Sequence, residues 1–238
     1  VLILSELIRR INPQIEVTAI YGNCLQNLAY EEMINADLVL GCTDTEHGRA
    51  VLGELAHRYL LPSIQVNVGL ESCGEQVQNQ VIEFTRYRPG QPCAYCRNQV
   101  DTHRLAQELM STEEKKMRQQ HAACVEYNGN ANSYWRDTAV IPTIGAVTTI
   151  AGELAANFAI GMLTDRFTPS SDFLEMDLLA ANLGAMSILL ESRPGCACKK
   201  YIGFNDQTPG GRVHTSATHW VKETVDRYHN DETVVEIG

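Results

Sequence analysis

The chain has 238 residues, of which 44% are hydrophobic and 20% are charged, a balance typical of a folded globular protein. Its formal net charge of −10 argues against non-specific binding to nucleic acid or to an anionic membrane, because both need a basic surface. Eight cysteines in a chain of this length, with no recognisable export leader, favour reduced thiols in a cytoplasmic protein over a secreted disulfide framework.

The first 36 residues predict a helix, a strand and a second, shorter helix. Apolar residues between Leu2 and Ile11 recur at helical spacing, and this helix is expected to end before Pro13, since proline disfavours helix in the residue before it. Residues 15–20 alternate as in a strand, and residues 27–35 predict a short helix.

The stretch of residues 37–49 carries the clearest functional signal. Its apolar run, residues 38–40, fits a strand of a parallel sheet that is covered on both faces. Helical spacing resumes over residues 51–59, with Thr45 as the expected N-cap. Asp44 is therefore expected at the carboxyl end of a parallel strand, where ligands bind in open α/β sheets. A carboxylate there can hold Mg²⁺ on the phosphates of a nucleotide, although Asp44 as a helix cap is the simpler interpretation.

The rest of the chain predicts further α/β elements. The apolar helix at residues 145–163 is rich in small residues but contains Glu153 and Asn157, so we expect a core or interface helix and no membrane span. An apolar face is costly to expose, so this helix also predicts a two-fold homodimer. Strands are expected at residues 62–68, 80–86, 173–177 and 185–191, with the last two forming a hairpin, and helices at residues 101–120 and 216–229.

Four of the cysteines form two close pairs, each after a Pro-Gly turn. The pairs are Cys93 with Cys96, and Cys196 with Cys198. Two such pairs suit a tetrahedral Cys₄ zinc site, which would be structural because it leaves no open position for a substrate. A redox C-x-x-C or simple buried thiols are the alternatives.

Five short strings, taken in order, resemble the ubiquitin-activating-enzyme superfamily over about residues 6–198. The closest resemblance is to the bacterial sulfur-carrier adenylyltransferases of the ThiF and MoeB kind. That family has Asn after the acidic residue, where this chain has Thr45. The strings are Arg10-Ile11-Asn12-Pro13, the D-L-V-L-x-C-T-D run that ends at Asp44 and is followed by Arg49, Cys93-Ala94-Tyr95-Cys96, Pro142-Thr143-Ile144-Gly145 and Pro194-Gly195-Cys196-Ala197-Cys198.

The resemblance implies a Rossmann-like mixed sheet flanked by helices, with a zinc held by the four paired cysteines. The family's first strand and glycine-rich turn, which cradle the ATP phosphates, would precede Val1, so the chain is expected to be truncated at its N-terminus. Residues 1–198 would form the adenylation domain, and residues 199–238 a C-terminal appendage with one helix.

The resemblance also implies a function for the complete protein. It would use ATP and Mg²⁺ to adenylylate the C-terminal carboxylate of a ubiquitin-like or sulfur-carrier protein, while the 238-residue fragment alone would be inactive. Asp44 and Thr45 would bind the nucleotide, and Arg49 would orient Asp44 or contact the nucleotide. Cys124, whose thiol pKa a neighbouring His121 could lower, would accept the acyl group. The alternatives are a non-catalytic partner subunit of an activating-enzyme heterodimer and a peptide-modifying adenylyltransferase.

Overall fold

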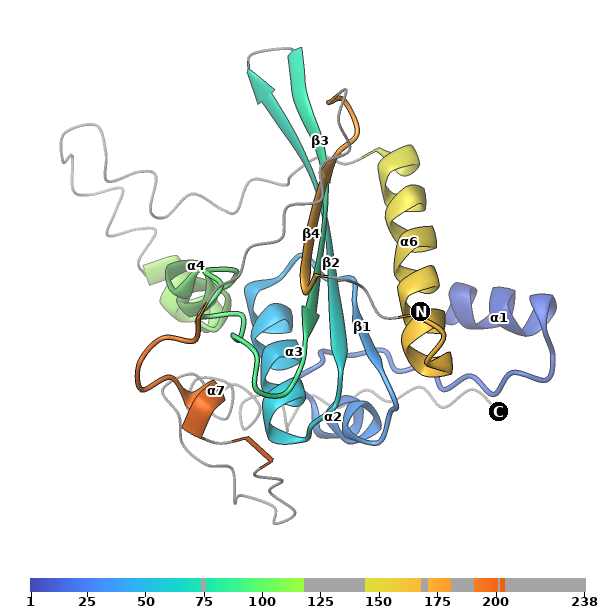
Figure 1. Ribbon diagram of the computed structural model, residues 1–238, viewed down its shortest axis with the longest axis horizontal. Helices are drawn as coiled ribbons and strands as arrows, with labels where there is room; N and C mark the ends of the chain where they lie inside the picture. The colour runs from blue at the N-terminus through green and yellow to red at the C-terminus, as the bar shows by residue number, and fades with distance from the viewer. Residues whose placement is uncertain (74–75, 118–143, 168–170, 181–190, 201, 204–238) are drawn as a thin grey trace. The chain divides into compact units, whose positions relative to one another are not determined.

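The computed structural model describes residues 1–73, 76–117, 144–167, 171–180, 191–200 and 202–203 (Figure 1). The chain folds as two compact units, one of which includes residues 1–36 and the other residues 37–205. The predicted strand at residues 185–191 therefore lies almost entirely outside the described residues, as do the predicted helix at residues 216–229 and Cys124.

Residues 1–36 of the first unit contain two helices, α1 (Leu2–Ile11) and α2 (Asn27–Ile34), as predicted. Helix α1 ends at Ile11, and its C-cap, Asn12, directly precedes the proline. The strand predicted at residues 15–20 is wrong, because this segment forms no ladder in the described part of the chain. Alternation makes a strand only where a neighbour accepts its hydrogen bonds, and here the carbonyl of Val17 binds the Arg9 guanidinium at 3.1 Å.

The described part of the second unit is built on a four-stranded mixed sheet, which confirms the mixed sheet that the family resemblance implied (Figure 1). Strand β1 pairs in parallel with β2, and the pairs β2–β3 and β3–β4 are antiparallel. Strands β2 and β3 run several residues beyond their predicted ends as one long hairpin. The predicted partner of β4 was residues 185–191, whereas the structure pairs β4 with β3. The strands are β1 (Val39–Gly41), β2 (Ser63–Cys73), β3 (Gln76–Tyr87) and β4 (Phe173–Asp177).

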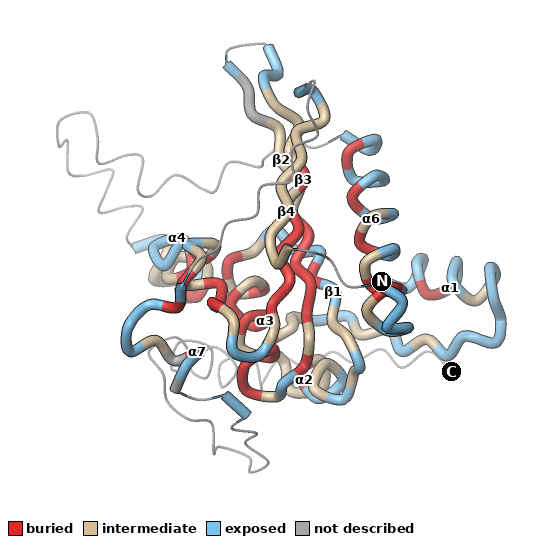
Figure 2. The backbone as a smooth tube through the Cα atoms, in the orientation of Figure 1, coloured by how far each residue is buried: buried red, intermediate tan, exposed pale blue. Residues whose placement is uncertain are grey.

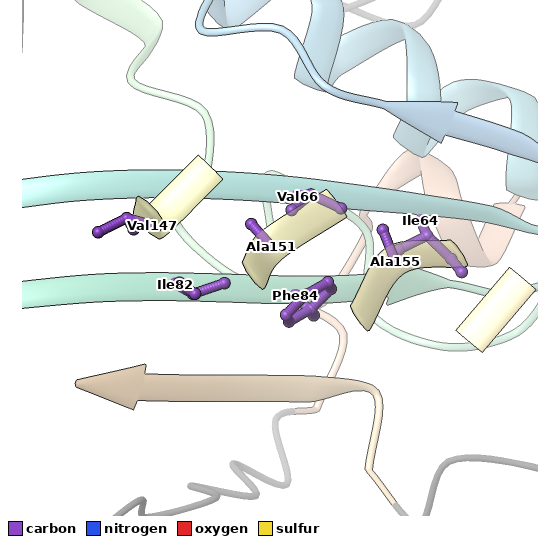
Figure 3. Close-up of a cluster of buried hydrophobic side chains, with 7 residues drawn as sticks. All are labelled: Ile64, Val66, Ile82, Phe84, Val147, Ala151 and Ala155. Atoms are coloured by element: carbon purple, nitrogen blue, oxygen red, sulfur yellow. The ribbon is translucent and has the colours of Figure 1, made fainter. Parts of the chain in front are cut away.

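Helix α6 (Gly145–Thr164) packs along one face of this sheet (Figure 3). Its contact residues Val147, Ala151 and Ala155 recur every four positions, which places them on one side of the helix. Because two of the three are alanines, the helix backbone lies close to the strands. The rings of Phe158 and Phe84 pack edge to face, with their centroids 5.4 Å apart. The strand residues beneath the helix are Ile64, Val66, Ile82 and Phe84.

Only one side of α6 is buried, so of the two kinds of helix predicted, a core helix or an interface helix, it is not a fully buried core helix (Figure 2). Ile160 is 61% exposed and Leu163 58% exposed. By length and composition the helix could cross a membrane. Its most apolar 18-residue stretch has a mean hydropathy of 1.4, and 28% of that stretch is buried. This is weak support for a span, because the core helix of a globular protein passes the same test.

Helix α3 (Glu46–Arg58) covers the opposite face of the sheet. The Ser63 hydroxyl donates to the carbonyl of Leu52 at 3.0 Å. Because successive strand residues point to opposite faces, Ser63 faces α3 while its neighbour Ile64 faces α6. The sheet is therefore a layer between two helices, and the turn from β1 to α3 lies at its parallel edge.

The single helix predicted at residues 101–120 is interrupted. Helix α4 (Thr102–Glu108) begins at Asp101, whose carboxylate accepts hydrogen bonds from the N–H groups of His103 and Arg104. A second helical stretch covers residues 112–117. Ser111 and Glu114 start it with a capping box, in which each side chain accepts a hydrogen bond from the backbone of the other, at 3.2 and 3.0 Å. The S-x-x-E pattern from Ser111 to Glu114 in the sequence indicates the start of this second helical stretch.

Candidate functional site

Asp44 lies in the turn between β1 and α3, at the carboxyl end of a strand that pairs in parallel. Its side chain is exposed. The cap of α3 is Thr45, as predicted, because its hydroxyl oxygen accepts the N–H of Gly48 at 3.3 Å. Thr45 thus fills the capping role that was the alternative for Asp44.

The turn that carries Asp44 is held on both sides. From the sheet, the Gln65 side chain, 1% exposed, donates from Nε2 to the carbonyl of Thr43 at 3.1 Å. From α3, Gly48 comes so close that a Cβ at this position would collide with the Thr43 hydroxyl. The Asp44 side chain is therefore exposed to solvent, while close packing and a partly buried hydrogen bond restrain the backbone of the turn.

Arg49 pairs with Glu46 rather than with Asp44. Its Nη1 lies 3.0 Å from Oε1 of Glu46, whose side chain is 3% exposed. The Nε of Arg49 is buried and has no hydrogen-bond partner among the described residues. Of the two roles expected for Arg49, the orientation of Asp44 has no direct contact behind it in the described part of the chain, and contact with the nucleotide stays a prediction.

Arg49 also lines a cavity of about 290 Å³ on the α3 side of the sheet. Arg97 brings a second guanidinium, whose Nε donates to the carbonyl of Pro92 at 2.9 Å. Two guanidiniums and several amides make a polar cavity suited to a ligand with carboxylate or amide groups. The other lining residues are Asn67, Glu83, Asn98, Gln99 and Phe173.

Sequence reasoning missed the polar residues beneath this cavity. Gln65 donates to Asn67 at 2.8 Å, and Asn67 donates to Glu83 at 3.3 Å, so a chain of hydrogen bonds crosses β2 and β3. The signal was present in the alternation of β2, where amides at positions 65 and 67 separate Ile64, Val66 and Val68. Buried amides cost free energy unless they are hydrogen-bonded. Amides on one face of a covered strand therefore favour a polar binding site on that face over an apolar core.

The four paired cysteines come together in a second site, as the sequence predicted. Their sulfur atoms all lie within 4.8 Å of one another, with Cys93 Sγ 3.6 Å from Cys196 Sγ and Cys96 Sγ 3.8 Å from Cys198 Sγ. Sulfurs at the corners of a tetrahedral zinc site with bonds of about 2.3 Å lie about 3.8 Å apart. The cluster therefore fits a metal ion held by four thiolates.

The surroundings of the cluster shift the pKa values of its thiols in both directions. Burial raises the pKa of the Cys93 and Cys196 thiols. Burial also raises the pKa of Cys96, but the N–H of Arg193, which donates to its sulfur at 3.2 Å, and the neighbouring thiols together bring it below the ordinary value. A bound cation would compensate the remaining cost of ionising buried thiols.

Helix α3 connects the two sites. Asp44 precedes its first turn, and near its last turn Nε2 of His57 lies 2.7 Å from the carbonyl of Gln91, two residues before Cys93. Ala94, which lies between the first two cysteines, packs closely against Gly53 of α3. A Cβ added at Gly53 would lie only 3.3 Å from the Cβ of Ala94. The cysteine cluster thus supports the helix that carries the Asp44 turn at its other end.

Comparison with known proteins agrees with these features. The ThiF family model matches residues 1–198, which include the Asp44 turn and all four clustered cysteines. No curated protein matches the chain. Because the family match covers most of its length, the chain belongs to the ThiF family.

Proposed function

We propose that the complete protein adenylylates the C-terminal carboxylate of a ubiquitin-like or sulfur-carrier protein. ThiF family members are in general ATP-using adenylyltransferases that act on such carriers. A carboxylate oxygen of the carrier would attack the α-phosphorus of ATP, the bond from that phosphorus to the β-phosphate oxygen would break, and pyrophosphate would leave. The observation that carries the proposal is an exposed carboxylate, Asp44, on a restrained turn at the end of a parallel strand.

The proposed roles follow from the chemistry of each side chain. Asp44 would hold Mg²⁺, which neutralises charge on the phosphates as the α-phosphorus is attacked. Arg49, whose side chain is 21% exposed and lines the cavity, would offer its guanidinium to a phosphate or carboxylate oxygen. The Thr45 oxygen accepts the cap bond, so its O–H remains as a donor to the nucleotide. Cys124 is proposed, from the family resemblance alone, as the thiol that accepts the acyl group.

We further propose that the four clustered cysteines hold a structural zinc ion. Such an ion would join the segment at Cys93 to the segment at Cys196, 103 residues later in the chain. With four thiolates around it, the ion has no open position, so no step of the reaction involves it. An adenylation domain at residues 1–198, the appendage after it and a cytoplasmic location remain predictions.

Pyrophosphate exchange tests this function in the complete protein. We expect ATP–pyrophosphate exchange that depends on a carrier protein with a free C-terminal carboxylate, and none when that carboxylate is amidated. If the chain is a partner subunit, it will show no exchange alone but will support exchange by a second subunit. If it modifies peptides, a short peptide will replace the carrier. Absence of both ATP binding and exchange in every combination would contradict the proposal.

The exposed side of α6 is the surface that we propose for self-association. Ala156, Ile160 and Leu163 lie there at spacings of three and four, and all three are exposed. An arginine in place of Ala156 would bury an unpaired charge in such an interface, so A156R is expected to convert a two-fold dimer into a monomer. Sedimentation at micromolar concentration measures the mass, with T112R, at an exposed position outside α6, as the matched control. A monomeric wild-type protein would refute the dimer.

A further inference from the structure

The carboxylate of Glu108, the last residue of α4, reaches the first turn of α3 about sixty residues earlier in the chain. Its Oε1 accepts the N–H of Glu46 at 2.9 Å, and its Oε2 accepts the N–H of His47 at 3.0 Å. The Nδ1 of His47 lies 2.9 Å from the same Oε2. A helix leaves its first N–H groups unpaired and carries a partial positive charge there, so a carboxylate in this position is doubly favoured.

Glu46, in the first turn of α3, binds the start of α4. Its Oε2 accepts the N–H of Asp101 at 3.0 Å, and Asp101 is the residue that caps α4. The other oxygen of Glu46 binds Arg49. A carboxylate from α4 therefore binds the start of α3, and a carboxylate from α3 binds the start of α4. Glu46 also links these contacts to Arg49, a proposed site residue.

The charge on Glu108 is stabilised where it lies. Burial raises the pKa of this carboxyl, but the hydrogen bonds from the His47 ring and from the N–H groups of Glu46 and His47 outweigh burial and leave the pKa below its ordinary value. The carboxylate is therefore the form that the folded protein favours at neutral pH, and this form can accept all three hydrogen bonds.

We propose that Glu108 is a positioning residue for Asp44 and Arg49, an inference that rests on the function proposed above. It acts through the first turn of α3, because Asp44 lies two residues before Glu46 and Arg49 one helical turn after Thr45. Thr45 satisfies only one N–H of that turn, and Glu108 satisfies two more. Without Glu108 the first turn of α3 loses two of its hydrogen-bond partners, and the separation of Asp44 from Arg49 is set less tightly.

The test combines hydrogen exchange of backbone amides with enzyme turnover, in the complete protein. In Glu108→Ala we expect the amides of Glu46 and His47 to lose protection, while those of Leu52 and Leu55 in the middle of α3 keep it. Turnover in pyrophosphate exchange is expected to fall by about 10- to 100-fold, with a smaller change in KM for the carrier, since a misplacement of about 1 Å can cost that much. Glu108→Gln keeps one acceptor oxygen and is expected to be intermediate in both measurements. Glu113→Ala, at an exposed position of the next helical stretch, is the control and should match the wild type in both.

Three results would overturn the inference. One is unchanged protection of the Glu46 and His47 amides in Glu108→Ala. Another is loss of protection along the whole of α3, which would mean a general structural role. The third is wild-type turnover despite a frayed first turn. The exchange of amides needs no substrate, so a wild-type protein without adenylation activity would contradict the proposed function while the contact of Glu108 with α3 is still tested.

Discussion

Replacing Cys198 with serine is expected to release the metal from the cysteine cluster and to lower the melting temperature by many degrees. The cluster joins two segments about a hundred residues apart, and three of its four cysteines are buried. Binding of a structural zinc ion contributes directly to folding, with apparent values of about 10–16 kcal/mol in zinc-finger peptides. Loss of one of four ligands removes a large part of that contribution and leaves three thiols in a site shaped for an ion.

Metal analysis and thermal melting together measure this effect. The wild-type protein should contain about one zinc ion per chain, the Cys198→Ser variant much less, and a chelator should lower the wild-type melting temperature toward that of the variant. Cys73→Ser removes an exposed thiol at the end of β2 and is expected to change neither metal content nor melting. A wild-type protein free of metal, or a Cys198→Ser variant that melts like the wild type, would refute the zinc site.

In the complete protein, Asp44→Ala is expected to lower pyrophosphate exchange by about 100- to 1,000-fold or more, the usual cost of removing one group that stabilises transition-state charge. The loss should appear in turnover, because the metal matters most as charge shifts on the α-phosphate. The melting temperature should hardly change, since the Asp44 side chain is exposed and Thr45 supplies the cap.

Two further variants make this result specific. Asp37→Ala removes an exposed carboxylate two residues before the same strand and should leave exchange unchanged. Thr45→Ala removes the cap and should cost about 0.5–2 kcal/mol of stability. If Asp44→Ala instead keeps wild-type exchange and melts at a lower temperature, Asp44 is only structural and the proposed nucleotide site is wrong.

The sequence by itself determined the features that depend on neighbouring residues. The apolar run, the turn after it and the helical spacing from residue 51 placed Asp44 correctly between β1 and α3, with Thr45 as the cap. The apolar pattern likewise placed α6 and β4 at nearly their observed bounds. Two close cysteine pairs predicted one cluster, because close pairs on turns leave few other ways to arrange four thiols around a metal.

Only the tertiary structure decided which partners these residues find. Residues 15–20 alternate as a strand should, yet a strand exists only where another strand binds it. The sequence left the partner of Arg49 open, since four carboxylates lie within twelve residues of it, and the structure pairs it with Glu46. Glu108 could not be linked to the first turn of α3 at all from the sequence, because about sixty residues separate them and their contact depends on how two helices pack. Local patterns indicated where elements such as α6 and β4 begin and end, whereas the hydrogen bonds that restrain the site cross between elements and are set only when the chain is folded.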